Sequence, residues 1–161
     1  MDAREEIMAL IPHRPPFLWV DRIISREPER IETEKLIPPE LELFRGHYPD
    51  HPLMPGVLLC EAIFQSGALL LAGNLADQGR PASEMPVLTR IVNARFKRQV
   101  RPGELAAISV SLQEQVGPAW FMKGKLRVGG ETAVSVEFAC ALVGGRQPGP
   151  DRASQGNEAR P

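Results

Sequence analysis

The order of apolar and polar positions along the chain predicts one long helix enclosed by a sheet. Residues 55–76 are apolar on nearly every side of a helix, a pattern typical of a buried helix rather than a surface one. The pattern ends before Gln-Gly-Arg-Pro at residues 78–81, where glycine and proline disfavour continuation. Because such a helix needs an apolar partner on every side, we expect the rest of the chain to wrap around it.

Six further segments are apolar or alternating in the manner of β-strands. They span residues 17–24, 30–37, 87–96, 105–112, 120–128 and 132–143. Pro-Gly, Gly-Pro and Gly-Gly pairs separate the last four at intervals suited to successive antiparallel strands. The predicted fold class is α+β, with a curved antiparallel sheet around one helix in a single domain over residues 1–143.

The last residues, 144–161, are polar, rich in glycine and proline and without apolar periodicity, so we expect a disordered tail. A formal net charge of −1 argues against a nucleic-acid binder, which would need a strong positive excess. Residues 57–72 are the one candidate for a membrane span. They are fewer than the roughly 20 residues that a span requires and include Glu61 and Gln65, so no membrane insertion is expected.

The two cysteines, Cys60 and Cys140, lie in apolar surroundings and form neither a CxxC pair nor a spacing typical of a metal site. This usage fits a reducing cytoplasm. The N-terminus carries charges of both signs with no long apolar segment after it, unlike a secretory signal. The sequence therefore predicts a cytoplasmic protein without a metal site.

The candidate chemistry lies where a turn-rich loop meets the long helix. Histidine has an unperturbed pKa of about 6.5, so His47 in a proline-rich loop is a candidate base. Pro55 suits the first position of a helix, and Gly56 lets a ligand approach free N–H groups that can face a developing negative charge. Glu61 is a candidate acid, because its apolar sequence neighbours favour the protonated carboxyl. These groups suit removal of a proton next to a carbonyl, followed by loss of a leaving group.

Other polar residues nearby have structural explanations. His13 is expected to hydrogen-bond near the first strand, and His51 to be a loop residue. Gln65 lies one helical turn beyond Glu61 on the same face, where it can orient the carboxylate or satisfy a backbone group. Glu61 itself can be a salt-bridged interface residue.

Four motifs occur in order: Ile-Pro-His-Arg-Pro-Pro-Phe-Leu-Trp-Val-Asp-Arg (11–22), Gly-His-Tyr-Pro-Asp-His-Pro-Leu-Met-Pro-Gly (46–56), Glu-Ala-Ile-Phe-Gln (61–65) and Ala-Arg-Phe-Lys-Arg-Gln-Val-Arg-Pro-Gly-Glu (94–104). With them the chain resembles, over about residues 11–143, the hot-dog-fold (3R)-hydroxyacyl-[acyl carrier protein] dehydratases of the FabZ type. The resemblance implies a hot-dog fold and reversible dehydration of a (3R)-3-hydroxyacyl thioester to the trans-2-enoyl thioester.

The resemblance also implies roles for particular residues. His47 would remove the α-proton, the Gly56 N–H would polarise the thioester carbonyl, and Glu61 from the partner protomer would protonate the departing hydroxyl. The substrate would be carried on the phosphopantetheine of an acyl carrier protein, with no other cofactor. The assembly would be a homodimer, which in that family is commonly built into a hexamer as a trimer of dimers.

Phe64 departs from the family pattern, which usually has a small residue before the glutamine of the helix motif. Its larger side chain is expected to bear on the shape of the acyl tunnel. Related dehydratase-isomerases share this feature but carry aspartate where this chain has Glu61, so dehydration alone is expected.

A basic run consists of Arg95, Lys97, Arg98 and Arg101. In a regular strand Arg95 and Lys97 share one face and Arg98 lies on the other, so the four form one patch only if the strand ends or bulges there. The run is either a solvated strand edge, where basic residues discourage pairing, or a docking site for the acidic carrier protein that the resemblance implies.

Two other functions fit the same pattern. A hot-dog thioesterase would use a carboxylate to activate water and would release free thiol from an acyl thioester. A non-catalytic acyl-carrier-binding subunit would keep the tunnel and the basic surface but would need neither His47 nor Glu61.

Overall fold

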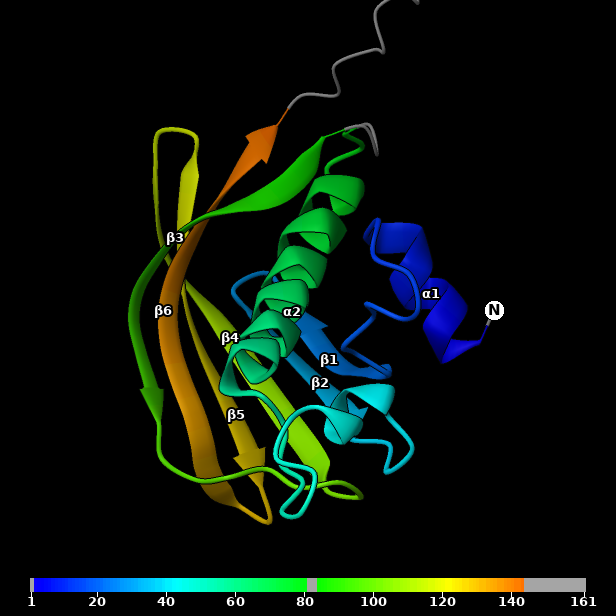
Figure 1. The fold of residues 1–161 in the computed structure, drawn as a ribbon. Helices are drawn as coiled ribbons and strands as arrows, with labels where there is room; N and C mark the ends of the chain where they lie inside the picture. The colour runs from blue at the N-terminus through cyan, green and yellow to red at the C-terminus, as the bar shows by residue number, and fades with distance from the viewer. Residues whose placement is uncertain (1, 81–83, 144–161) are drawn as a thin grey trace, which may run out of the picture.

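The computed structural model describes residues 2–80 and 84–143, so the predicted tail at 144–161 lies outside the described residues. Its central helix, α2 (Gly56–Asp77), lies against the concave face of a curved six-stranded antiparallel sheet (Figure 1). The sheet order is β1-β2-β4-β5-β6-β3. The strands are β1 (Arg22–Glu27), β2 (Arg30–Leu36), β3 (Met85–Phe96), β4 (Leu105–Val116), β5 (Ala119–Val128) and β6 (Glu131–Val143). The predicted α+β architecture is confirmed.

The helix α2 is buried on nearly all sides, as its sequence predicts. Ile63 and Leu69 have no exposed surface and face different directions around the helix axis. The sheet covers one side, and the segment with α1 (Ala3–Leu10) lies on the other (Figure 1). By length and composition α2 is apolar enough to cross a membrane, yet most of it is buried in this core, which is consistent with a soluble protein.

The sheet approaches α2 most closely where a strand residue has no side chain. A Cβ atom on Gly124 of β5 would overlap Cγ2 of Ile63 in α2, and it would also touch Val110 at 3.5 Å. Glycine at this position therefore sets how near the sheet can come to the helix, because core packing leaves no space for an added methyl group.

The first predicted strand, residues 17–24, is wrong over most of its length, because β1 covers Arg22–Glu27. The backbone before β1 finds its hydrogen-bond partners on a side chain of α2 instead of on a strand. The Trp19 N–H donates to Gln65 Oε1 at 2.8 Å, and Gln65 Nε2 donates to the Phe17 carbonyl at 3.1 Å. Leu18, Trp19 and Val20 are buried without belonging to the sheet.

Two short helices were not predicted. In α1, Asp2 and Glu5 form a capping box: the Glu5 N–H donates to Asp2 Oδ1 at 2.8 Å, and the Asp2 N–H donates to Glu5 Oε2 at 2.9 Å. Ile7 anchors α1 in the core. The short 3₁₀ helix η1 (Glu42–Arg45) leads into the loop that holds His47.

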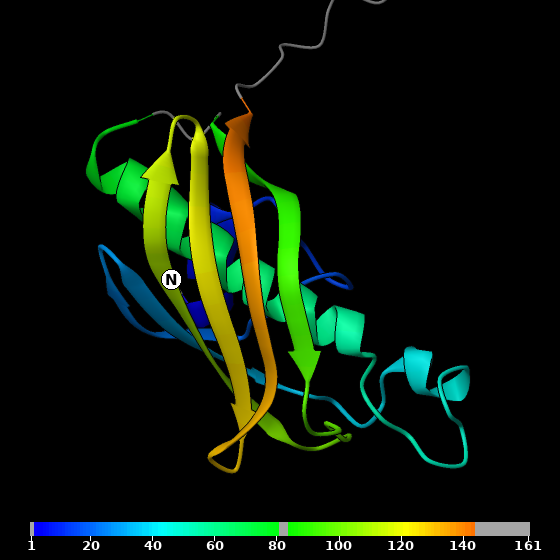
Figure 2. The same ribbon diagram turned by 90° about the vertical axis from the view of Figure 1, so that its left-hand side faces the viewer.

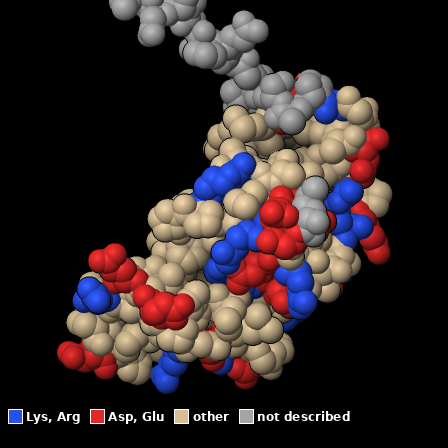
Figure 3. Space-filling view, turned by 90° about the vertical axis from the view of Figure 1, so that its right-hand side faces the viewer, with Lys and Arg blue, Asp and Glu red and all other residues tan. Residues whose placement is uncertain are grey.

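Charges on the face that includes α1 are intermixed, without a large field of either sign (Figure 3). This distribution agrees with the net charge of −1 and offers no continuous basic surface on that side.

The strand β3 forms one edge of the sheet (Figure 2). Within the described residues it pairs only with β6, and its apolar side chains are exposed on both faces: Ile91 is 53% exposed and Val92 is 56% exposed. A long apolar edge strand is open to pairing with another chain and is normally covered. The edge along β3 is therefore a candidate interface.

Candidate active site

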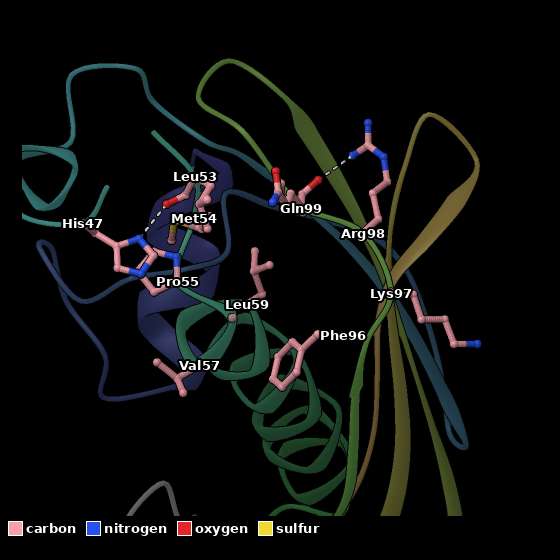
Figure 4. A pocket seen from close by; sticks show the side chains of 12 residues that line it. His47, Leu53, Met54, Pro55, Val57, Leu59, Phe96, Lys97, Arg98 and Gln99 are labelled. Atoms are coloured by element: carbon pink, nitrogen blue, oxygen red, sulfur yellow. Dashed lines mark hydrogen bonds between the residues drawn. The ribbon is translucent and has the colours of Figure 1, made fainter. Parts of the chain in front are cut away.

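Hydrogen bonds hold both the backbone and the imidazole ring of His47. After η1 the His47 N–H donates to the Leu43 carbonyl at 2.9 Å, and the ring Nδ1 lies 2.9 Å from the Leu53 carbonyl (Figure 4). A carbonyl can only accept, so in the neutral ring this hydrogen bond assigns the proton to Nδ1 and leaves the lone pair on Nε2. His47 is thus held in the tautomer that a general base requires.

The half-buried His47 lines a cavity of about 590 Å³ that also receives the N-terminus of α2. Pro55 is the N-cap residue, one position earlier than predicted, and its carbonyl accepts from the N–H groups of Leu58 and Leu59. Within the described part of the chain, the N–H groups of Gly56 and Val57 have no acceptor. Such unpaired first-turn N–H groups can hold an oxygen that gains negative charge.

Phe96, at the end of β3, packs over this helix terminus (Figure 4). A Cβ atom on Gly56 would lie 2.7 Å from Cε1 and 2.9 Å from Cδ1 of Phe96. Any larger residue would push the ring aside, so glycine is needed for ring and backbone to share this wall. Sequence reasoning missed Phe96, although it stands inside the fourth motif.

Glu61 lies in a second cavity, of about 270 Å³. Its Oε1 accepts from Gln65 Nε2 at 2.9 Å and lies 3.6 Å from Nε2 of His13. Since Gln65 also binds the backbone of Phe17 and Trp19, it both orients the carboxylate and satisfies backbone groups. Phe64 lines the same cavity, and its ring packs on Phe138 with centroids 4.9 Å apart.

The two cavities have no lining residue in common within one chain. The His47 cavity lies by Phe96, at the end of β3, whereas the Glu61 cavity lies by Met85–Leu88, at the start of the same strand. A single chain therefore keeps the candidate base and the candidate acid in separate pockets along one open sheet edge.

Neither cysteine is a candidate nucleophile. Burial, and then the nearby Glu61 carboxylate, raise the pKa of the Cys140 thiol to about 12. Burial also raises the pKa of the Cys60 thiol. Both thiols are protonated at neutral pH, and the thiolate is the reactive form.

The basic run does not form one patch. Arg95 and Lys97 line a hollow on the outer face of the sheet together with Lys123. Arg98 binds Glu104 Oε1 at 2.8 Å and lies 3.3 Å from Glu131, and its hydrogen bond lowers the pKa of Glu104. The exposed Arg101 guanidinium lies 3.5 Å from His51. The strand does end within the run, at Phe96, yet Arg98 and Arg101 lie against loop partners instead of joining Arg95 and Lys97.

A family model and several curated relatives indicate the same family for this chain. The model of the FabA-like domain matches residues 11–137. The 3-hydroxyacyl-[acyl-carrier-protein] dehydratase FabZ of Xylella fastidiosa is 37% identical over 86% of this chain and 87% of that protein. The FabZ proteins of Cupriavidus metallidurans (39% identical, 85% and 91% covered) and Clostridium acetobutylicum (38%, 86% and 96%) are similarly related.

Two solved structures share the fold. A chain of the dehydratase heterocomplex ApeI:P from Xenorhabdus doucetiae superposes with a TM-score of 0.72 at 13% identity, covering 85% of this chain and 90% of that one. An uncharacterized protein from Pyrococcus horikoshii gives a TM-score of 0.62 at 16% identity, covering 80% and 87%. The expected hot-dog fold is confirmed.

Replacing Gln65 by methionine tests its place in the site. Methionine keeps the length of the side chain but leaves the buried Trp19 N–H without its acceptor, so the free energy of unfolding should fall by about 1–3 kcal/mol. Urea unfolding measures the change. Gln78→Met, on the exposed end of the same helix, is the matched control and should stay within about 0.5 kcal/mol of wild type. Equal stability of the two variants would contradict this role of Gln65.

Proposed function

The chain belongs to the family of FabZ-type 3-hydroxyacyl-[acyl-carrier-protein] dehydratases, and we propose that His47, Gly56 and Glu61 carry the reaction. The protein is a hydro-lyase that dehydrates 3-hydroxyacyl-[acyl-carrier-protein] in fatty acid biosynthesis. One observation carries the proposal for the residues: the hydrogen bond from His47 to the Leu53 carbonyl leaves Nε2 unprotonated in a cavity that also contains unpaired helix N–H groups.

In the first half of the reaction, His47 Nε2 removes the α-proton of the thioester. The carbonyl oxygen gains negative charge as the Cα–H electron pair moves toward it. The N–H groups of Gly56 and Val57 are placed to hold that oxygen, and one such donor is typically worth about 10²–10³ in kcat. Phe96 supplies an apolar wall that keeps water from these donors.

In the second half, the electron pair forms the Cα=Cβ double bond while the bond from Cβ to the 3-hydroxyl oxygen breaks. Glu61 gives its proton to that oxygen, and water leaves. The reverse sequence hydrates the enoyl thioester. Both proton transfers are carried by side chains of the protein, so we propose that no metal or cofactor takes part beyond the phosphopantetheine of the carrier.

We propose that the complete site is formed in a homodimer, through β3. Two copies of an antiparallel edge strand pair with the end of one against the start of the other. The His47 cavity at the Phe96 end would then meet the partner's Glu61 cavity at the Met85 end. The same pairing would cover the exposed Ile91 and Val92. Assembly of three dimers into a hexamer is compatible with this arrangement, and a cytoplasmic location fits the buried thiols.

Dehydration is distinguishable from the thioesterase and from the non-catalytic subunit by one assay. The protein is incubated with enoyl thioesters on carrier protein and on coenzyme A, and loss of the conjugated-enoyl absorbance reports hydration. Release of free thiol without hydration would indicate a thioesterase, and no change in either would indicate a binding subunit.

Mixing two inactive variants tests the shared site. His47→Ala and Glu61→Gln should each lower kcat by at least about 10²-fold, because each removes a proton-transfer group. After subunit exchange half of the dimers are mixed, and each has one intact site of two, so about a quarter of wild-type activity should return. Mass spectrometry of tagged chains verifies the exchange. No recovery after verified exchange would place both groups of a site in one chain.

Charge reversal tests the carrier surface, with Lys97 and Arg98 as a matched pair. Lys97→Glu should raise KM several-fold for carrier-bound substrate and leave the coenzyme A substrate unchanged, because only the carrier presents an acidic protein surface. Arg98→Glu faces Glu104 and Glu131, so it should affect both substrates and lower the melting temperature. If Lys97→Glu changed KM equally for the two substrates, Lys97 would not be part of the carrier-docking surface.

Truncation of Phe64 tests substrate length. Its ring is 7% exposed, packs on Phe138 and lines the Glu61 cavity, so Phe64→Ala should open space there and shift kcat/KM toward longer acyl chains. The truncation should cost roughly 3–5 kcal/mol of stability. The ratio of kcat/KM for long and short enoyl thioesters is the measurement. An unchanged ratio in a folded variant would assign Phe64 to packing alone.

A further inference from the structure

The carboxylate of Glu61 has two oxygens in unlike surroundings. Oε1 accepts from Gln65 Nε2 at 2.9 Å and is also the oxygen nearest to His13 Nε2, at 3.6 Å. No hydrogen bond within the described residues reaches Oε2. Because a carboxylic acid carries its proton on one oxygen, donors that converge on Oε1 direct that proton to Oε2.

The surroundings of His13 assign its tautomer. Its Nδ1 is buried and has no hydrogen-bond partner within residues 2–80 and 84–143. A proton on Nδ1 would be a buried donor without an acceptor, which is unfavourable, whereas a proton on Nε2 faces the carboxylate of Glu61. Of the two neutral tautomers, the one with its proton on Nε2 is therefore favoured. Its 3.6 Å separation from Oε1 is slightly longer than a hydrogen bond, as is common in unliganded sites that tighten on substrate binding.

The backbone around His13 is held firmly. The guanidinium of the next residue, Arg14, donates to the carbonyls of Met8 (2.9 Å), Ile11 (2.8 Å) and His13 (2.7 Å). Ile11 is 2% exposed, so the segment is also anchored in the core. These contacts fix the direction of the His13 side chain. Its imidazole points toward Glu61, and His13 and Glu61 line the same cavity.

We propose that His13 is a positioning residue for Glu61. When substrate binding tightens the site, the Nε2–H groups of His13 and Gln65 both donate to Oε1, which leaves Oε2 to carry the proton delivered to the departing 3-hydroxyl. His13 contacts the acid rather than the substrate, so its effect is on proton delivery and not on removal of the α-proton. This role rests on the proposed dehydration mechanism. It adds to that mechanism that Oε2 of Glu61 is the oxygen that delivers the proton.

Two amide substitutions separate the donor from the ring. The amide nitrogen of glutamine reaches about as far as Nε2 of histidine, whereas that of asparagine reaches only as far as Nδ1. His13→Asn should lower kcat for dehydration by about tenfold to a hundredfold with little change in KM, the size seen when an orienting hydrogen bond is lost. His13→Gln should stay within a few-fold of wild type. His13→Phe keeps the ring without the donor and replaces the asparagine variant if that variant does not fold.

A second measurement isolates His47. Exchange of the α-protons of a saturated acyl thioester with deuterated solvent needs the base and the helix N–H groups but has no hydroxyl to protonate. This exchange should be unchanged in His13→Asn. Wild-type kcat in that variant would overturn the role of His13, and so would an equal fall in exchange and dehydration, which indicates a general loss of site structure. If the wild-type protein did not dehydrate the substrate, the proposed function itself would be wrong, and the proposed role of His13 would be wrong as a consequence.

Discussion

The enclosure of α2 is the constraint on which the rest of the structure depends. A helix that is apolar on every side is stable in water only if other elements cover it, and here the curved sheet and the N-terminal segment do so. Polar groups on such a helix must find partners inside the core. Gln65, which is 1% exposed, binds the backbone of the covering segment, and Ser66 binds Thr33 at 2.7 Å and the Ala62 carbonyl at 2.8 Å. The same helix therefore both forms the core and orients the carboxylate of Glu61.

The enclosed helix also explains why the site is divided. Its N-terminus opens into the His47 cavity, while Glu61, five residues later, opens into another. A covering wide enough to bury the helix separates the two openings, and both lie along β3. The exposed apolar edge of β3 favours aggregation of a single chain, and it is also a surface on which two chains can pair. The proposed pairing at this edge would cover the exposed surface and would also bring the two cavities together, so stability and the proposed chemistry favour the same assembly.

Much of the fold could be predicted because its signals are local and strong. The helix predicted at 55–76 lies at 56–77, and glycine and proline turns place the last strands well. The run at 17–24 was misassigned because an apolar pattern does not tell whether the backbone pairs with a strand or with a side chain such as Gln65. The eight-residue α1 is too short to be marked by periodicity, although its capping box is visible.

The site was predictable only in part, for the same reason. His47 and Glu61 stand in recognisable motifs, but the separation of their cavities depends on the path of β3. The contact between His13 and Glu61 joins residues 48 positions apart, and nothing in the local pattern around His13 indicates it. Phe96 is similar, because its packing on Gly56 joins a strand end to a helix start.

The basic run shows how a charged residue can contribute to a site without touching it. Arg98 binds Glu104 and so fixes the loop between β3 and β4. Within that loop the Val100 carbonyl accepts from the Met54 N–H at 2.7 Å, and the carbonyl just before Met54 is the one that accepts from His47. The ion pair therefore contributes to the position of the carbonyl that sets the tautomer of His47. The positive charge of Arg98 therefore serves the architecture of the loops around His47, which limits how much of the basic run remains to recognise the proposed carrier.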